Sequence, residues 1–204
     1  MFKKLPLGRF ETNCYIIADD ASKEAAVIDP ADDFQVIKQF IENHHLKVKY
    51  ILLTHAHGDH ILALPELKAY SEAPVGLNSG DEDMLLDANI NHSGQFTKTP
   101  IEGKPDFYLK DGDELGLGTT KIHIIHTPGH TKGGTCILYE KDLMAGDTLF
   151  ARGIGRTDLY GGNYQTLIDS IKTKLFVLPD DTIVHPGHGS STTILSEKNN
   201  NPFN

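Results

Sequence analysis

The sequence has few cysteines and no long hydrophobic run, and each shortage excludes a class of protein. Its 204 residues contain two cysteines, Cys14 and Cys136, which are too few for a disulfide framework at this length. Each cysteine lies in a strand-like run, so we expect two reduced thiols in the core. No apolar run approaches the ~20 residues that span a membrane. The sequence therefore predicts neither a disulfide scaffold nor a membrane protein.

Secretion and nucleic-acid binding are not indicated either. The first ten residues, MFKKLPLGRF, contain two lysines but no apolar segment behind them, which is not typical of a secretory signal. We therefore expect a cytoplasmic protein. The net charge is -9, whereas a nucleic-acid-binding protein needs a basic stripe. The expected partner is a small molecule, and the sequence does not indicate an oligomeric state.

Strand and helix patterns alternate along the chain. Residues 14–19 and 25–30 are β-rich runs, and residues 34–41 then place four apolar side chains on one helical face. Further strands are predicted at 47–54, 73–78, 121–127, 135–139, 142–147 and 182–185, and further helices at 61–71, 81–88, 163–178 and 192–198. Residues 89–105 are predicted to form a long loop. Strands followed by helices, twice over, favour two sheets between helices in a single domain over residues 1–204.

The segment Thr54–His60, THAHGDH, follows directly after the apolar run YILL and concentrates ligand-type side chains. Two histidines separated by one residue on a turn can direct both imidazoles toward one point. Gly58 lets the backbone bend, so that Asp59 and His60 face a second point. This pattern predicts a metal site at the end of a strand.

Three later loops bring one further ligand each. His130 in TPGH, Asp147 in AGD and His188 in HPGHG all follow predicted strands and have a glycine beside them. Imidazole and carboxylate ligands without thiolate suit zinc, iron(II) or manganese, and we expect zinc. Seven ligands are too many for one tetrahedral ion but suit two.

The seven side chains divide into two sets that share a carboxylate. The predicted sets are His55, His57 and His130 for one ion and Asp59, His60 and His188 for the other, with Asp147 as the bridge. A carboxylate can neutralise two cations that lie ~3.5–4 Å apart, and a water between them loses a proton near neutral pH. The remaining six histidines are predicted to be surface or packing residues: His44, His45, His92, His123, His126 and His185.

Four motifs in order, THAHGDH, TPGHT, GDTLF and PGHG, resemble the metallo-β-lactamase superfamily. FARGIGRTDL, the helix NYQTLIDSI and the tail that ends in NPF resemble its short glyoxalase II-like hydrolases. The resemblance covers nearly the whole chain and implies a four-layer αββα sandwich with two metals at one edge, between the sheets. It also implies hydrolysis of a hydroxyacyl-glutathione thioester such as S-lactoylglutathione. A metal-bridging hydroxide then attacks the carbonyl, one metal stabilises the oxyanion, and Asp59 orients the nucleophile.

The sequence departs from full-length glyoxalase II at its C-terminal end. Those enzymes carry a helical domain that supplies basic residues to glutathione, whereas this sequence ends sixteen residues after His188. The segment ARGIGRTDLYGG offers substitutes. Arg152 and Arg156 are candidate contacts for a substrate carboxylate, and Tyr160 is a candidate contact for its body. Alternatively, Arg156 forms a salt bridge with Asp158 that holds this loop.

Other functions use the same fold and stay open. A mononuclear iron dioxygenase acting on glutathione persulfide keeps the first motif but uses fewer ligands, so the seven ligands favour two metals. A di-iron module that reduces oxygen and a non-catalytic binding protein are weaker alternatives. Lactonase or β-lactamase activity is a possible side reaction.

Overall fold

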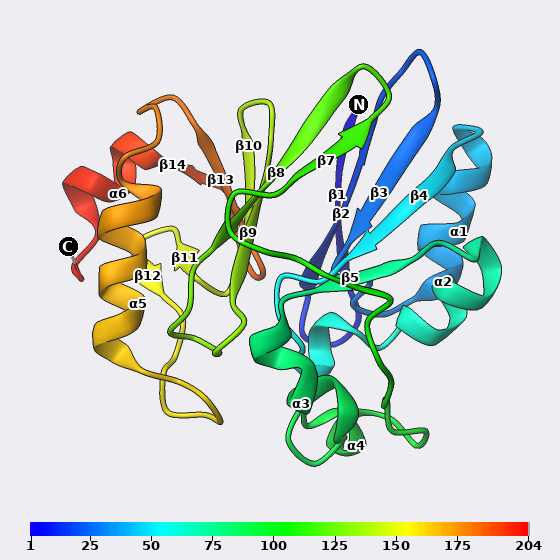
Figure 1. Ribbon diagram of the computed structural model, residues 1–204, viewed down its shortest axis with the longest axis horizontal. Coiled ribbons are helices and arrows are strands. Elements are labelled where there is room, and N and C mark those ends of the chain that lie inside the picture. Colours follow the sequence, from blue (N-terminus) through cyan, green and yellow to red (C-terminus); the bar gives the residue numbers. More distant parts are fainter. Residues whose placement is uncertain (204) are drawn as a thin grey trace.

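The computed structural model describes residues 1–203 and contains two mixed β-sheets that pack against each other between helices (Figure 1). The N-terminal sheet has the order β1 (Phe2–Leu7), β2 (Thr12–Ala18), β3 (Glu24–Ile28), β4 (Lys47–Leu52), β5 (Val75–Leu77) and β6 (Phe107–Tyr108). Its first three strands are antiparallel, and β3 to β6 are parallel.

The C-terminal sheet has the order β14 (Thr192–Thr193), β13 (Ile183–Pro186), β10 (Asp142–Gly146), β9 (Thr135–Tyr139), β8 (Thr120–His126) and β7 (Glu114–Leu117). Strands β10 and β13 are parallel, whereas β8, β9 and β10 alternate in direction. A short hairpin, β11 (Leu149–Phe150) and β12 (Gly153–Ile154), follows β10. Consequently β8, β10 and β13 all run in one direction and end at the same edge.

Helices cover the outer face of each sheet. Figure 1 shows α1 (Phe34–Asn43) and α2 (Leu64–Ser71) beside the N-terminal sheet, and α5 (Tyr164–Ser170) and α6 (Ile194–Asn200) at the opposite end of the molecule. The short helices η1 (Gly58–His60), η2 (Ser79–Asp81), α3 (Glu82–Leu86) and α4 (Ser93–Phe96) lie in the loops between β4 and β6. The predicted αββα sandwich is therefore confirmed.

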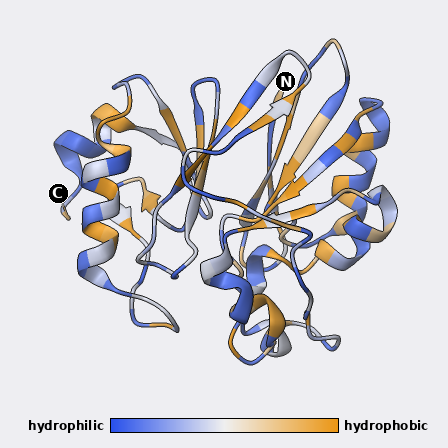
Figure 2. Cartoon of the chain, in the orientation of Figure 1, coloured by the Kyte–Doolittle hydropathy of each residue, from blue (hydrophilic) through white to orange (hydrophobic). Residues whose placement is uncertain are grey.

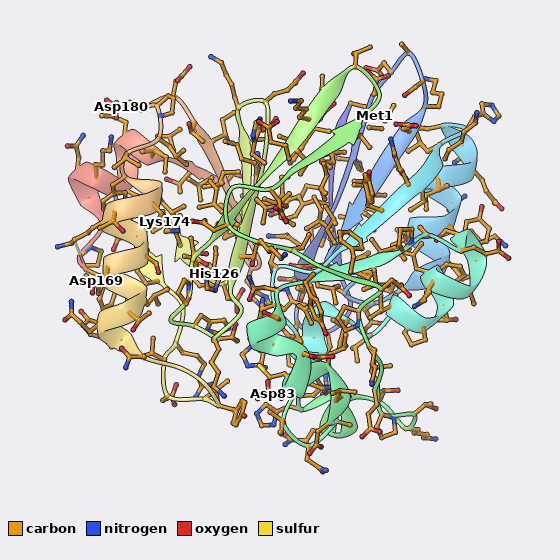
Figure 3. All side chains as sticks on the ribbon, in the orientation of Figure 1. Met1, Asp83, His126, Asp169, Lys174 and Asp180 are labelled. Carbon is orange, nitrogen blue, oxygen red and sulfur yellow. The ribbon has the colours of Figure 1, made fainter. Side chains whose placement is uncertain are left out.

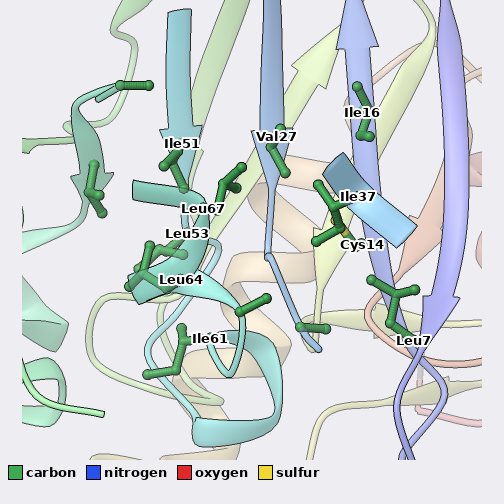
Figure 4. Close-up of a cluster of buried hydrophobic side chains, with 14 of the residues drawn as sticks. Leu7, Cys14, Ile16, Val27, Ile37, Ile51, Leu53, Ile61, Leu64 and Leu67 are labelled. Atoms are coloured by element: carbon green, nitrogen blue, oxygen red, sulfur yellow. The ribbon is translucent and has the colours of Figure 1, made fainter. Parts of the chain in front are cut away.

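Three apolar layers hold the sandwich together. Alternate side chains of β2 point to opposite faces, so Ile16 packs toward α1 with Ile37 (Figure 4), while Ile17 packs between the sheets against Ile122. The third layer joins the C-terminal sheet to α5 and α6, as with Val184. Figure 2 shows the hydrophobic segments along the strands and hydrophilic segments on the outer helices.

Both cysteines are free and buried, and they belong to different layers. Cys14 lies in the layer against α1, and Cys136 in the layer against α5. Burial raises the pKa of the Cys136 thiol to about 11 and raises that of Cys14 further. Both are therefore neutral core side chains, as the sequence predicts. Among residues 1–203, no helix is long and apolar enough to cross a membrane.

Some elements differ from the pattern-based prediction. The helix expected at 163–178 is α5 followed by a π-helical segment, η3 (Ile171–Leu175). The predicted loop at 89–105 contains one helical turn, α4. Strand β1 was not predicted, because it is an edge strand with Pro6 and an irregular burial pattern.

Candidate metal centre

The seven predicted ligands meet where strands of both sheets end. His55 to His60 follow β4 of the N-terminal sheet, while His130, Asp147 and His188 follow β8, β10 and β13 of the other. Because these last three strands run in one direction, their carboxyl ends lie at one edge, opposite the end of β4. The site therefore exists only when the two sheets are packed together.

The first cluster consists of His55, His57 and His130. One ring nitrogen of each lies within 4.8 Å of the others, and Nδ1 of His57 is 3.0 Å from Nε2 of His130. Ligand atoms that lie 2.0–2.1 Å from a tetrahedral ion are roughly 3.3 Å apart. All three imidazoles are buried. This spacing fits three nitrogen donors around one ion.

The second cluster consists of Asp59, His60 and His188. Oδ2 of Asp59 lies 3.2 Å from Nε2 of His188 and 3.8 Å from Nε2 of His60. Asp147 lies between the clusters. Its Oδ1 is 3.4 Å from His60 Nε2, and its Oδ2 is 3.7 Å from Nε2 of His130 in the first cluster. The predicted bridging position of Asp147 is thus geometrically available.

Four side-chain atoms at the centre are buried without a hydrogen-bond partner: His55 Nε2, His57 Nε2, His60 Nε2 and Asp147 Oδ1. A buried polar atom without a partner costs about 1–3 kcal/mol. Four such atoms in one place are the mark of a site that binds a ligand, and imidazole and carboxylate donors are those of a divalent metal.

Hydrogen bonds on the far side of the His55, His60 and His130 rings direct their Nε2 atoms toward the centre. Nδ1 of His60 donates to Asp29 Oδ2 at 2.9 Å, and the same carboxylate accepts from Oγ1 of Thr54, which in turn faces Nδ1 of His55 at 3.0 Å. Nδ1 of His130 donates to the carbonyl of Arg156 at 2.7 Å. These bonds select the tautomer that leaves Nε2 free to bind a metal.

The environment of the centre favours the protonation states that metal binding needs in four of the proposed ligands. Burial lowers the pKa of His57 to about 3 and also holds that of His55 well below its usual value. Burial raises the pKa of Asp59, but the charge of His60 together with the hydrogen bond and charge of His188 outweighs this effect and lowers the pKa to about 2. The pKa of Asp147 is lowered in the same way. His55 and His57 are therefore neutral and both carboxylates are charged. Burial alone would lower the pKa of His60 and of His188, but the nearby carboxylates outweigh it and raise both.

Two glycines are required by close approach. A Cβ at Gly187 would lie 2.2 Å from Oδ1 of Asp147, so a side chain there would displace the carboxylate. A Cβ at Gly58 would lie 2.7 Å from the backbone of Ser93 and 2.9 Å from the carbonyl oxygen of Asn91. Gly58 therefore provides space for the following loop rather than a left-handed bend. From the sequence, Gly58 was expected to let the backbone bend; in the structure its role is to leave room for residues 91–93.

A buried carboxylate, Asp81, joins two of the ligand loops. It accepts hydrogen bonds from Oγ1 of Thr131 at 2.7 Å and from the backbone N–H of Gly133 at 2.6 Å. The backbone N–H of Ala56 is a further donor, and burial raises the pKa of Asp81. Asp81 thus fixes the loop of His130 against the first motif, a role that no sequence motif indicates.

A cavity of about 310 Å³ opens onto the two clusters. Besides the ligands, its walls comprise Phe10, Asn91, His92, Phe96, Arg156 and Leu159. The guanidinium of Arg156 forms two 2.7 Å bonds to Asp158, as the alternative prediction stated. Arg152 and Tyr160, the other two candidate substrate contacts, do not line this cavity.

The hydroxyl of Tyr160 points to α3 instead. It donates to Oδ2 of Asp83 at 2.5 Å, and Nζ of Lys132 lies 3.1 Å from the same hydroxyl. Asp83 lies on α3 at the lower edge of the view in Figure 3. This contact ties the loop between β12 and α5 to α3.

Several cavity residues were not identified from the sequence. His92, assigned to the surface or to packing, stacks on His57 with ring centroids 6.4 Å apart. Asn91 is buried, and its carbonyl accepts from the N–H of Gly58 at 2.7 Å, which holds the long loop over the cluster. Phe10 comes from the β1–β2 turn. No short sequence motif marks these residues as part of the site, because they come together only when the chain folds.

Two sheets between helices, with a histidine-rich metal-binding site at the strand ends, define a class of metal-dependent hydrolases. The family model of the metallo-beta-lactamase superfamily matches residues 7–188. The chain therefore belongs to the metallo-β-lactamase superfamily, which confirms the resemblance.

Characterised and uncharacterised relatives match over almost the full length. The chain is 41% identical to a probable metallo-hydrolase, YqgX, of Bacillus subtilis, over 99% of this chain and 96% of the relative. It is 39% identical to the hydroxyacylglutathione hydrolase GloC of Haemophilus influenzae, over 98% and 95% of the two chains.

Solved structures show the same fold. BLEG-1, a B3 metallo-beta-lactamase, superposes with a TM-score of 0.92 at 40% identity, over 100% of this chain and 99% of the other. TTHA1623, in a di-iron-bound form, has a TM-score of 0.88 at 32% identity, over 99% and 100%. ETHE1 from Myxococcus xanthus has a TM-score of 0.82 at 30% identity, over 99% and 83%.

Proposed function

We propose that the chain is a binuclear metal-dependent thioester hydrolase that cleaves hydroxyacyl-glutathione, with S-lactoylglutathione as a substrate. The observation that carries the proposal is the pair of three-residue clusters on either side of the Asp147 carboxylate. A single-metal enzyme does not need the second cluster of Asp59, His60 and His188. The 39% identity to the hydroxyacylglutathione hydrolase of Haemophilus influenzae supports this class of thioester.

Two divalent ions suit these donors, with zinc as the proposed metal and iron or manganese as alternatives. Bound there, such ions polarise a carbonyl and supply a hydroxide nucleophile at neutral pH. The di-iron-bound relative supports a pair of ions. The proposed assignment is His55, His57 and His130 for one ion and Asp59, His60 and His188 for the other, with Asp147 between them.

The chain's own residues hold Asp59 in position and form an apolar wall on one side of the cavity. Oγ1 of Thr12 lies 3.4 Å from Oδ2 of Asp59, which helps to hold this carboxylate toward the centre, where we propose that it orients the nucleophile. Phe10, Phe96 and Leu159 form an apolar wall beside the reacting carbonyl. The leaving thiolate has a low pKa, about 8.5 for an ordinary thiol, so the site needs no strong acid for it.

The loop between β12 and α5 is proposed to contact the substrate. Arg156 lines the cavity, but a substrate carboxylate must compete with Asp158 for its guanidinium. Arg152 lies in the turn between β11 and β12, and Tyr160 lies on the loop between β12 and α5. Both are outside the cavity wall and reach a substrate only if its thiol part extends beyond the cavity. These contacts are therefore weaker candidates than Arg156.

The test is hydrolysis of S-D-lactoylglutathione by protein loaded with zinc, iron or manganese, with a chelated sample as control. We expect chelator-sensitive turnover with kcat/KM above ~10⁴ M⁻¹s⁻¹, the low end for ordinary enzymes. A metal-replete protein without turnover would exclude this substrate. Oxygen uptake by iron-loaded protein with glutathione persulfide, in the absence of thioester hydrolysis, would replace the proposal with a mononuclear iron dioxygenase.

A further inference from the structure

The turn between β1 and β2 is fixed to the metal centre. Thr12 forms an isolated antiparallel bridge with His188, and the carbonyl oxygen of Phe10 accepts a hydrogen bond from Nδ1 of His188 at 3.1 Å. The backbone N–H of Asn13 donates to the carbonyl of Gly187 at 2.7 Å. Since Phe10 also lines the cavity, this turn is a permanent part of the cavity mouth.

Arg9 on this turn extends over two aromatic rings of the cavity wall. Its Cζ lies 4.6 Å from the ring centroid of Phe10 and 5.2 Å from that of Phe96. The two rings contact each other edge to face, with centroids 4.7 Å apart. A guanidinium over aromatic rings is held in place while its N–H groups stay free to bind an anion. Arg9 does not itself line the cavity, but it lies directly over two of the rings that do, and so beside the cavity mouth.

Two other cations near the cavity are already paired with carboxylates. Arg156 is bound through two hydrogen bonds to Asp158, and Nζ of Lys132 lies 3.4 Å from Asp83. Within residues 1–203, no carboxylate forms an ion pair with Arg9, although the chain carries an excess of acidic residues. Arg9 thus brings an uncompensated positive charge to the entrance.

We infer that Arg9 binds a carboxylate of the substrate and makes the enzyme selective for anionic thioesters over neutral ones. The inference rests on the proposed thioester hydrolysis and names the group that the site recognises. Glutathione carries two carboxylates on the thiol side of its esters. A guanidinium binds a carboxylate through two parallel N–H···O bonds. Arg9 therefore supplies, from the N-terminal hairpin, the cation that this chain needs for such a thiol.

The experiment compares two esters that share the acyl group: S-D-lactoylglutathione and S-D-lactoyl-N-acetylcysteamine, which has no carboxylate. Arg9→Met removes the charge but keeps an apolar contact with both rings. We expect kcat/KM for the glutathione ester to fall roughly two- to fivefold, as for an exposed ion pair, through a higher KM. The neutral ester should react at an unchanged rate, which also shows that the variant is folded.

Two controls sharpen this test. Lys47→Met removes an exposed cation at the start of β4, the end of the strand away from the cluster, and should change neither rate. Arg9→Lys keeps the charge and should recover part of the preference for the glutathione ester. This preference should also decrease with added salt in the wild type, because an exposed pair is screened.

The outcomes separate the inference from the proposed function. Equal losses on both esters in Arg9→Met, or no loss on either, would overturn the role of Arg9 while the hydrolase stands. Failure of the metal-replete wild type to hydrolyse both esters would overturn the proposed function, and the inference with it.

Discussion

The carboxylate of Asp29 lies 2.9 Å from Nδ1 of His60 and fixes the direction in which Nε2 of this ring faces the metal centre. Both residues are buried, so no water replaces either partner. Asp29 also accepts hydrogen bonds from the N–H and the hydroxyl of Thr54, at 2.7 and 2.6 Å. One carboxylate thereby aligns the first motif with the end of β3.

Asp29→Asn should weaken metal binding at the second cluster. An amide cannot accept all three of these hydrogen bonds, so the ring of His60 is no longer held. Loss of such an outer partner reduces metal affinity or activity roughly 10–100-fold. A competitive chelator titration of the metal-replete protein measures the change. Asp20→Asn, an exposed carboxylate on the β2–β3 turn, is the control and should bind metal like the wild type.

Asp147→Ala should lose both metal content and thioester hydrolysis. Its carboxylate lies within 4 Å of histidines from both clusters, with Oδ1 near His60 and Oδ2 near His130 and His188, so the substitution removes a proposed donor that both sites share. The loss should exceed the roughly 10–100-fold effect of an outer partner. Elemental analysis after dialysis and a rate assay check this. Full activity in a metal-replete variant would contradict the bridging position.

Asp81→Ala should destabilise the fold as well as the site. The substitution leaves buried donors of Thr131 and Gly133 without a partner, at about 1–3 kcal/mol for each. Denaturant unfolding of the metal-free protein measures the free energy. Asp83→Ala, two residues further along on α3, removes two exposed contacts and one half-buried backbone hydrogen bond, and should cost less than Asp81→Ala, about 1 kcal/mol. Similar losses of unfolding free energy in both variants would argue against a stabilising role of the buried Asp81 hydrogen bonds.

Asp158→Asn should lower KM for S-D-lactoylglutathione. The paired guanidinium of Arg156 lowers the pKa of Asp158 to about 2, so this carboxylate is charged and competes with the substrate. Neutralising it frees Arg156, and we expect a change of roughly two- to threefold, the scale of an exposed pair. Arg156→Ala should raise KM instead. An unchanged KM in both variants would remove this loop from the substrate site.

The metal-free protein should lose stability as the pH falls from 6.5 toward 3. Burial lowers the pKa of His57 to about 3, so the unfolded chain binds a proton in this range and the folded chain does not. The contribution of His57 to the free energy of unfolding is fully present above pH 6.5. Below this pH it decreases by up to about 1.4 kcal/mol per pH unit. His60 has a raised pKa, so its contribution to the free energy of unfolding is present below pH 6.5 and is lost as the pH rises through its pKa in the folded protein.

His57→Gln isolates this effect, because glutamine does not titrate. Unfolding of chelated wild type and variant at pH 7, 6, 5 and 4 should give a shallower pH dependence in the variant. Parallel curves would show that His57 is not the group responsible.

The seven side chains that the sequence predicts as ligands come together in the structure, and each could be picked out because it is part of a short local pattern. THAHGDH and PGHG place a strand end, a glycine and a ligand side by side, so spacing alone identifies them. Asp29 shows no such pattern, since an aspartate before proline after a strand is an ordinary turn, and its partners lie 25 and 31 residues away. Arg9 and Phe96 likewise meet only after the chain has folded.

The fold was predicted where periodicity is strong, as in α1 and in the strand that precedes the first motif. It was missed where tertiary contacts override local preference. β6 has two residues and forms only because β5 offers its edge. The π-helical segment after α5 cannot be distinguished from an α-helix by the spacing of its apolar residues.

The division of the ligands between the two sheets orders the events of biosynthesis. His55 to His60 leave the ribosome long before His188, and Asp147 lies between them in the chain. A nascent chain therefore holds only a partial ligand set until β13 has been made and docked. Ions that bind the completed set join the two halves and add their binding free energy to the cohesion of the sandwich. On the proposed ligand assignment, the complete set of donors is thus available only after both sheets have docked.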